Sequence, residues 1–225
     1  MRLAEFRSTK LYDLLAGLPL MLWFGYGAMK LRPGLMADAQ AAMAQPGDLL
    51  ADLRFLSLLL AALFNLMIVV MVILRDGPVR RAEGLLPRAA AVAGTFLGVG
   101  IIHLPPVTLS PGWQAAATAL LALGGLGSVA ALTQLGRAFS ILPEARRLVT
   151  DGPYAWARHP LYAAEIVTLA GTAMLFHQPW AALLAVAVVA LLFSRTHFEE
   201  RVLVATYPEY AAYRARTARF IPGIW

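Results

Sequence analysis

The sequence predicts an all-α membrane protein, a polytopic helical bundle with about six transmembrane helices. Hydrophobic residues occupy 60% of its 225 positions, charged residues only 14%, and the mean hydropathy is +0.66. A soluble domain of this size carries considerably more charge. The apolar residues also gather into long runs with polar segments between them. The chain is therefore expected to cross a membrane several times.

Six apolar runs define the predicted spans, and turn-forming residues mark their ends. The first run is closed by Lys30 and Pro33, and Pro111 stands where the fourth helix can use it in its first turn. The short connection at His177 to Pro179 makes the last two spans an antiparallel hairpin. The predicted spans cover residues 11–29, 55–74, 89–107, 113–135, 160–176 and 180–193.

Glycines inside two of the spans predict close helix packing. The third span holds Gly94, Gly98 and Gly100, a spacing that lets a neighbouring helix approach. The run Gly124-Gly125-Leu126-Gly127 in the fourth span resembles part of a dinucleotide-binding loop, but no strand precedes it and it lies within a membrane segment. Close packing, or room for a ligand, explains this run better.

The basic residues predict the orientation of the chain. All but three of the 19 lysines and arginines lie on one side if the amino terminus is cytoplasmic, the exceptions being Lys30, Arg32 and Arg54. Both termini are then cytoplasmic, and a bacterial inner membrane is the expected location. Membrane topology therefore explains the net charge of +6 without a nucleic-acid partner. The chain has no cysteine, which excludes disulfides and thiolate chemistry, and we assign no metal site.

Two domains are expected. Residues 1–135 hold four spans, and residues 136–225 hold a polar surface segment, the helical hairpin and an amphipathic tail. The surface segment covers 136–158 and the tail covers 194–225, with a helix break at Tyr207-Pro208. The predicted topology places both polar segments on the same side of the membrane, as a shared site requires.

The most distinctive polar stretch is Leu148-Val-Thr-Asp-Gly-Pro-Tyr-Ala-Trp-Ala-Arg-His-Pro-Leu-Tyr162. Asp151-Gly152-Pro153 is a turn signal, and Pro160 favours a helix that begins there. The first turn of that helix would leave backbone N–H groups free beside Arg158, His159 and Tyr162, where they could hold an anionic or carbonyl-bearing group. An ordinary membrane-surface loop anchored by its aromatic residues is the alternative.

A second motif follows the last span. Arg195 and Glu199 lie one helical turn apart and face the same way. An exposed ion pair would be the simplest explanation and would contribute only about 0.3 to 0.5 kcal/mol. At a membrane boundary, however, both charges are partly desolvated, and a pair that also binds a ligand becomes credible.

Together the two motifs resemble those of the isoprenylcysteine carboxyl methyltransferase family. The shared elements are Leu-Val-Thr-x-Gly-x-Tyr-x-x-x-Arg-His-Pro-x-Tyr and a later Arg, a Glu pair and Tyr-x-x-Tyr, which cover roughly the carboxy-terminal third. The resemblance implies S-adenosylmethionine bound on the cytosolic side without a Rossmann domain, and a lipid substrate that enters from the bilayer. The implied cofactor-binding residues are Arg147, Leu148, Val149, Tyr154, His159, Pro160, Leu161, Tyr162 and Glu199.

The same resemblance implies that Arg195 and Glu199 are catalytic, with Arg195 contacting the substrate carboxylate. Glu165 lies within a predicted span and outside the eukaryotic signature. Two roles are open for this ionisable residue: it contacts the substrate, or it pairs with Arg158 or His159. The expected partners are membrane lipid and a lipophilic or prenylated small molecule, with the oligomeric state left open.

Carboxyl O-methylation of an isoprenylcysteine-like acid is the first functional hypothesis. An ionised carboxylate needs no general base, so the protein must orient it and exclude water. N-methylation of a phospholipid or another lipophilic amine is the alternative, and it requires a base such as His159 or Glu165. A non-enzymatic transporter or scaffold is disfavoured, because the sequence has no internal repeat and its ionisable residues gather at one face.

Overall fold

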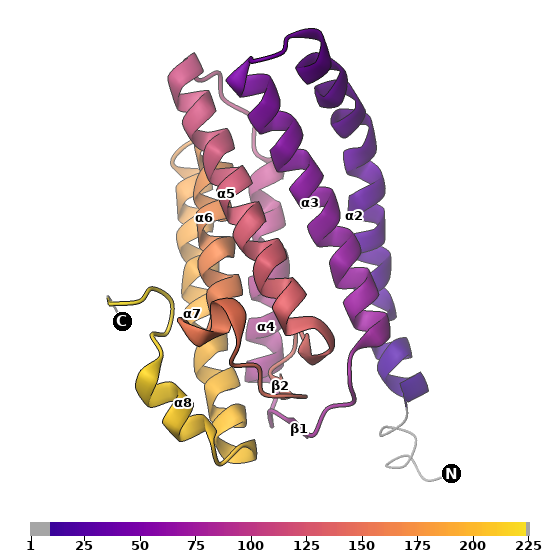
Figure 1. Cartoon of the computed structure of the whole chain (residues 1–225), viewed down its shortest axis with the longest axis vertical. Helices are drawn as coiled ribbons and strands as arrows, with labels where there is room; N and C mark the ends of the chain where they lie inside the picture. Colours follow the sequence, from indigo (N-terminus) through magenta and orange to yellow (C-terminus); the bar gives the residue numbers. More distant parts are fainter. Residues whose placement is uncertain (1–9, 224–225) are drawn as a thin grey trace.

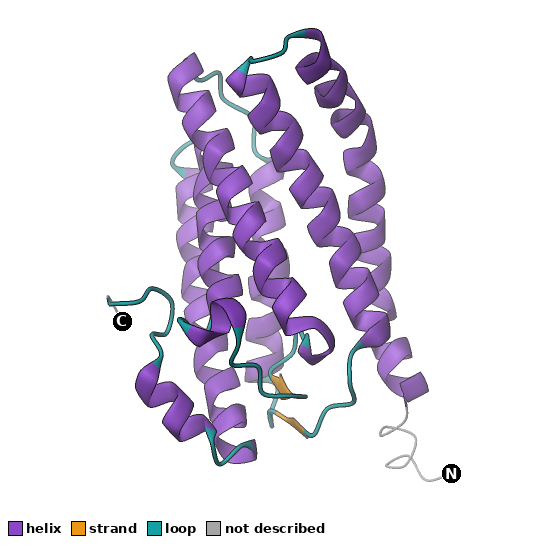
Figure 2. Ribbon diagram, in the orientation of Figure 1, coloured by secondary structure: helices purple, strands orange, loops and turns teal. Residues whose placement is uncertain are grey.

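The computed structural model describes residues 10–223, which form an all-α bundle with seven α-helices (Figures 1 and 2). The α-helices are α2 (Lys10–Ala44), α3 (Leu49–Leu74), α4 (Leu86–Phe96), α5 (Pro111–Leu135), α6 (Pro160–Met174), α7 (Trp180–Thr206) and α8 (Tyr210–Arg216). Three 3-10 helices cover Leu97–His103, Gly136–Ala138 and Gly152–Ala155, and two short strands cover Arg80–Arg81 (β1) and Glu144–Ala145 (β2).

Successive long helices run in opposite directions along the bundle (Figure 1). Five helical segments of the described chain are long and apolar enough to cross a membrane, namely Lys10–Ala44, Leu49–Leu74, Leu86–His103, Pro111–Ala138 and Trp180–Thr206. They agree with a multi-pass integral membrane protein. The prediction of about six spans is corrected in one respect, because α6 has only 15 residues. At about 1.5 Å per residue it is shorter than the roughly 30 Å of hydrocarbon that a spanning helix crosses.

The first helix is longer than predicted. We expected a span over residues 11–29 that ends near Pro33, but α2 continues through Pro19 and Pro33 to Ala44. A Cβ placed on Gly34 would lie 3.2 Å from the side chain of Leu58, so α2 still packs against α3 beyond the proline. This packing explains why the helix continues past a residue that removes one backbone hydrogen bond.

The last long helix is also longer than predicted. The sixth span was expected to end at residue 193, before an amphipathic tail, but α7 runs without interruption to Thr206. Arg195, Thr196 and Glu200 are buried on it. The side chains of Arg195 and Glu200 have partners elsewhere in the fold, and the Thr196 hydroxyl donates to the carbonyl oxygen of Phe193 on the same helix. The predicted break at Tyr207-Pro208 is confirmed, because α8 begins at Tyr210.

Close packing at the glycine run of α5 is confirmed. A Cβ placed on Gly124 would lie 2.6 Å from the backbone nitrogen of Thr168 and 2.7 Å from the carbonyl oxygen of Ala164, both on α6. A Cβ on Gly125 would lie 2.9 Å from Leu60 on α3. Glycine at these positions thus allows α5 to pack tightly between α3 and α6.

A network of buried charges joins the first helix to the polar segment before the site. The Asp13 carboxylate of α2 pairs with Arg75 at 2.7 Å and with Arg146 at 2.9 Å, and Arg146 also pairs with Glu144 at 2.7 Å. Strands β1 and β2 pair antiparallel beside this network, with Arg81 opposite Glu144. Because each buried charge has a partner, the network fixes residues 144–146 relative to α2 and α3.

Candidate functional site

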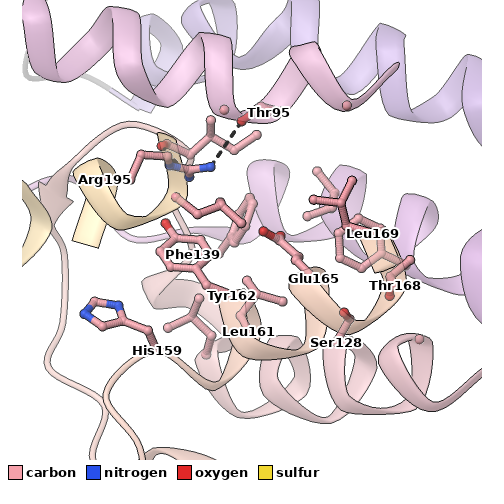
Figure 3. Close-up of a pocket in the computed structure, with 18 of the residues that line it drawn as sticks. Thr95, Ser128, Phe139, His159, Leu161, Tyr162, Glu165, Thr168, Leu169 and Arg195 are labelled. Carbon is pink, nitrogen blue, oxygen red and sulfur yellow. Dashed lines mark hydrogen bonds between the residues drawn. The ribbon is translucent and has the colours of Figure 1, made fainter. Parts of the chain in front are cut away.

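A cavity of about 690 Å³ extends through the bundle from its interior to the end that holds α8. Phe24, Leu58 and Phe64 give its wall on α2 and α3 an apolar surface. Its other end carries ionisable side chains from α6 and α7, together with residues of the loop before α6. Figure 3 shows that the side chains of Tyr162, Glu165 and Arg195 lie around the same space.

Most of the predicted site residues line this cavity although they lie on four different segments. The lining includes Arg147, Leu148, Val149, Tyr154, His159, Leu161, Tyr162, Glu165, Arg195 and Glu199. Pro160 is the exception among the predicted residues, because it begins α6 without lining the cavity. The predicted helix start at Pro160 is confirmed, and the His159 side chain forms no capping hydrogen bond with this helix.

Arg195 is held firmly at the boundary between the cavity and α4. Its side chain is 6% exposed, its Nη2 donates to the carbonyl oxygen of Ile141 at 3.0 Å, and its Nη1 lies 3.4 Å from the Thr95 hydroxyl (Figure 3). The guanidinium carbon lies 4.9 Å from the centre of the Tyr162 ring, a cation–π contact. A Cβ on Gly94 would lie 3.1 Å from Arg195 Cδ, so this glycine makes room for the arginine.

Glu199 and Tyr162 connect Arg195 to His159. The Tyr162 hydroxyl donates to Glu199 Oε1, and the predicted one-turn pair is present, with Arg195 Nη2 3.9 Å from the same oxygen. His159 Nδ1 lies 3.9 Å from Glu199 Oε2, and the imidazole stacks on the Tyr162 ring at 5.7 Å between centroids. The charged end of the cavity is therefore one connected group of side chains.

Glu200 joins the carboxy-terminal tail to the loop before α6. Its carboxylate lies 2.9 Å from Arg158 Nε, 3.1 Å from His159 Nε2 and 3.2 Å from Arg219 Nη2. The backbones run side by side as well, because the N–H groups of Arg158 and His159 donate to the carbonyl oxygens of Ala218 and Arg219. The two predicted polar segments thus meet at the same end of the molecule.

The aromatic residues of α8 complete this junction. The Tyr213 hydroxyl donates to the carbonyl oxygen of Tyr154 at 2.7 Å. Burial raises the pKa of Tyr213 to about 12, so the phenol remains a neutral donor throughout the physiological range. Tyr210 is 1% exposed, and its hydroxyl has no hydrogen-bond partner among residues 10–223.

Glu165 does not pair with Arg158 or His159, which corrects one of the two alternatives for this residue. Both of those side chains contact Glu200 instead. Glu165 lines the cavity one turn beyond Tyr162 on α6 and points into the same space (Figure 3). Within the described part of the chain, no hydrogen bond or ion pair satisfies its carboxylate.

Sequence reasoning assigned no role to Glu200, Thr95 or the carbonyl of Ile141. Glu199 and Glu200 are adjacent in the second motif, but neighbouring residues on a helix point about 100° apart. Only one of them can therefore face the cavity, and the other must bind elsewhere. Thr95 and Ile141 carry no local signal, because their contacts with Arg195 join positions 100 and 54 residues apart.

The residues at the charged end fit S-adenosylmethionine. The carboxylate of Glu199 could receive its amino or ribose groups and oppose its sulfonium charge. The first backbone N–H groups of α6 lie beside the cavity without a side-chain cap, which suits a carboxylate. The buried Tyr210 hydroxyl, unpartnered among the described residues, offers a further polar contact in the cavity wall.

The fold and the cavity define a multi-pass helical membrane protein with a charged pocket at one end of an apolar cavity. Residues 117–205 match the model of the isoprenylcysteine carboxyl methyltransferase (ICMT) family. The matched residues include the polar stretch from Leu148 to Tyr162 and the pair Arg195 and Glu199, so the match confirms the resemblance seen in the motifs.

Three curated relatives extend the comparison. The chain is 35% identical over 119 residues to a protein-S-isoprenylcysteine O-methyltransferase of Schizosaccharomyces pombe. The aligned residues make up 50% of each chain. It is 37% identical over 110 residues, 47% of this chain and 50% of the relative, to the cobalt-zinc-cadmium resistance protein CzcN of Cupriavidus metallidurans. It is 34% identical over 111 residues, 47% of this chain and 51% of the relative, to the nickel-cobalt-cadmium resistance protein NccN of Alcaligenes xylosoxydans xylosoxydans.

The chain spans about half the length of the curated relatives it matches. Two of the relatives are named for metal resistance and one for methyl transfer. Among residues 10–223, no group of three or more histidine, aspartate or glutamate side chains could hold a metal ion.

Proposed function

We propose that this protein transfers a methyl group from S-adenosylmethionine to the carboxylate of a lipophilic acid, such as an isoprenylcysteine-like compound, at the cytoplasmic side of a membrane. The observation that carries the proposal is a buried guanidinium, Arg195, fixed at the charged end of a long apolar cavity. The match to the isoprenylcysteine carboxyl methyltransferase family model and the similarity to a relative named as an O-methyltransferase support it.

S-adenosylmethionine supplies a methyl group on a sulfonium, which an ionised carboxylate oxygen can accept directly in an in-line displacement. Arg195 binds and orients that carboxylate. Thr95 and Ile141 each contact one of its terminal nitrogens and so hold the guanidinium in place. A cationic group held in place before the substrate arrives lowers the entropic cost of alignment.

The apolar remainder of the cavity suits the hydrocarbon part of the acceptor. Residues from α2, α3 and α5, including Phe24, Phe64 and Leu121, line it away from the charged end. This wall excludes water from the acceptor carboxylate, which strengthens its interaction with Arg195 and frees its oxygen for attack.

N-methylation of a lipophilic amine is the second candidate. The observation that favours it is Glu165, a carboxylate in the cavity wall with no hydrogen-bond partner in the described chain. A protonated amine must lose a proton before it can attack, and a nearby carboxylate could accept that proton.

Calorimetric titration with S-adenosylhomocysteine in detergent tests the cofactor assignment. We expect the wild type to bind and Glu199→Ala to lose most of its affinity, while Glu83→Ala, a change at an exposed loop carboxylate, binds as the wild type does. A folded wild-type protein that does not bind contradicts the proposal.

Labelled methyl transfer distinguishes the two candidate acceptors. A methyl ester releases volatile methanol in mild alkali, whereas an N-methyl group remains attached. We expect base-labile label when a lipophilic acid is offered. Base-stable label formed from a phospholipid amine would favour the second candidate.

A further inference from the structure

Arg195 and Glu165 face the same cavity from different helices without touching. Arg195 lies on α7 and Glu165 on α6, and both line the cavity (Figure 3). No ion pair within 4.0 Å joins them, although their charges are opposite. The space between them is therefore bounded by a cation on one side and a carboxylate on the other.

The two side chains are separated along the axis of the cavity. The guanidinium of Arg195 lies over the Tyr162 ring, and Glu165 follows Tyr162 by three residues on the same face of α6. Three residues rise about 4.5 Å along a helix. Glu165 thus lies beyond the proposed carboxylate site, toward Thr168 and the apolar part of the cavity (Figure 3).

An acceptor with hydrocarbon directly behind its carboxylate would leave Glu165 against an apolar chain. Burying a carboxyl group without a hydrogen bond is costly. An acceptor with an N–H or O–H group next to its carboxylate would satisfy Glu165 while Arg195 holds the acid. The neighbouring Thr168 hydroxyl donates its only hydrogen to the carbonyl oxygen of Ala164 at 3.2 Å, so it has none left to donate to Glu165.

We propose that Glu165 is a specificity-determining residue that accepts a hydrogen bond from a donor group beside the acceptor's carboxylate. The acceptor is then a lipophilic acid with an amide, amine or hydroxyl hydrogen close to the acid, and not a simple long-chain acid. This inference rests on the proposed function, because it assumes that Arg195 binds the acid.

Two matched acids test the inference. N-acetyl-S-farnesylcysteine carries an amide N–H beside its carboxylate, and 3-(farnesylthio)propionic acid lacks only the acetamido group. Binding of each acid to the detergent-purified protein is measured by calorimetry, and methyl transfer to each is measured as kcat/KM. The wild type should prefer the first acid by about 10-fold or more, the range expected for a hydrogen bond to a charged group.

Variants at one position show whether Glu165 produces that preference. Glu165→Leu should bind the two acids about equally, and Glu165→Gln should keep part of the preference because its amide oxygen still accepts a hydrogen bond. Thr168→Val is the matched control on the next turn, and it should keep the full preference. Affinity for S-adenosylhomocysteine should remain unchanged in Glu165→Leu.

The outcomes separate this inference from the proposed function. Methyl transfer to both acids with equal efficiency overturns the inference and leaves the function intact. Selective binding of the first acid without any transfer contradicts the function while supporting the inference. Three further outcomes overturn the inference. Glu165→Leu could retain the preference or lose affinity for S-adenosylhomocysteine, and Glu165 would then have another role. The third outcome is that the wild type binds neither acid.

Discussion

At the scale of single residues, the site consists of buried charges whose partners determine their roles. Glu199 lines the cavity and contacts Tyr162 and Arg195, whereas the adjacent Glu200 does not line it and contacts Arg158 and Arg219. Glu199 therefore fits a binding role, and Glu200 fits a structural one. Substitutions at Arg195 and Glu200 should have different consequences for the same reason.

Arg195→Ala should abolish methyl transfer and leave S-adenosylhomocysteine binding largely intact. The proposed role of this guanidinium is to orient the acceptor, and its anchors, Thr95 and Ile141, lie outside the proposed cofactor residues. Single-turnover transfer and calorimetry measure the two effects separately. Arg195→Lys should recover little activity, because an ammonium group cannot reproduce two divergent contacts and a planar stacking face. Simultaneous loss of binding and transfer would contradict this division of roles.

Glu200→Ala should destabilise the protein by about 3 kcal/mol or more, because it removes the counter-charge of Arg158 and Arg219 and a hydrogen-bond partner of His159. Thermal unfolding in detergent measures the loss. Glu83→Ala removes a carboxylate of the same type from an exposed loop and should leave the unfolding temperature unchanged. Equal unfolding temperatures for the two variants would show that the Glu200 contacts are not important for stability.

At the scale of elements, the short helix α6 is positioned by the longer helices beside it. Its first turn carries His159 and Tyr162 into the charged end of the cavity, and Ala164 and Thr168 pack against the glycines of α5. The position of the site therefore depends on how closely α5 and α6 approach.

Gly124→Ala should lower stability by about 1 to 3 kcal/mol, the usual cost of overpacking. The added Cβ would meet the backbone of α6 at Ala164 and Thr168, so one helix must move. Gly112→Ala is the control, because a Cβ there meets no atom within 4 Å. Thermal unfolding of both variants tests the prediction, and an unchanged Gly124→Ala protein would disprove the close contact.

At the scale of the whole molecule, the amino-terminal helices and the carboxy-terminal third share one cavity and one charge network. Phe24 and Phe64 line the cavity together with Arg195, and Asp13 pairs with Arg146 in the polar segment before the site. The four helices before residue 136 therefore contribute to the site wall, although most of them lie outside the residues that match the family.

The predicted topology can be tested directly, because the chain has no cysteine. Gln45→Cys, between α2 and α3, should react with an impermeant maleimide in intact spheroplasts. Glu83→Cys, between α3 and α4, should react only after permeabilisation, since the distribution of lysine and arginine places it in the cytoplasm. The reverse labelling pattern would place both termini and the charged end of the cavity outside the cytoplasm.

Much of the fold follows from local sequence. The apolar runs, Pro111 and Pro160 indicate the helices and two of their starting points, and the glycines of α5 predict close packing. These features depend on residues near one another in the chain. The helix lengths were less predictable, because packing on Leu58 extends α2 past Pro33, and paired polar groups extend α7 past residue 193.

The sequence by itself determined the class of protein, the starts of α5 and α6, and the two motifs whose residues line the cavity. Tertiary structure alone decided which charges pair, because pairing depends on side chains that meet across distant segments. Arg158 and His159 contact Glu200 and leave Glu165 without a partner in the described chain. Thr95 and Ile141 hold Arg195 from positions with no motif of their own. The residue type alone determines whether a side chain can carry a charge, but the packing of the helices determines its burial and its partner.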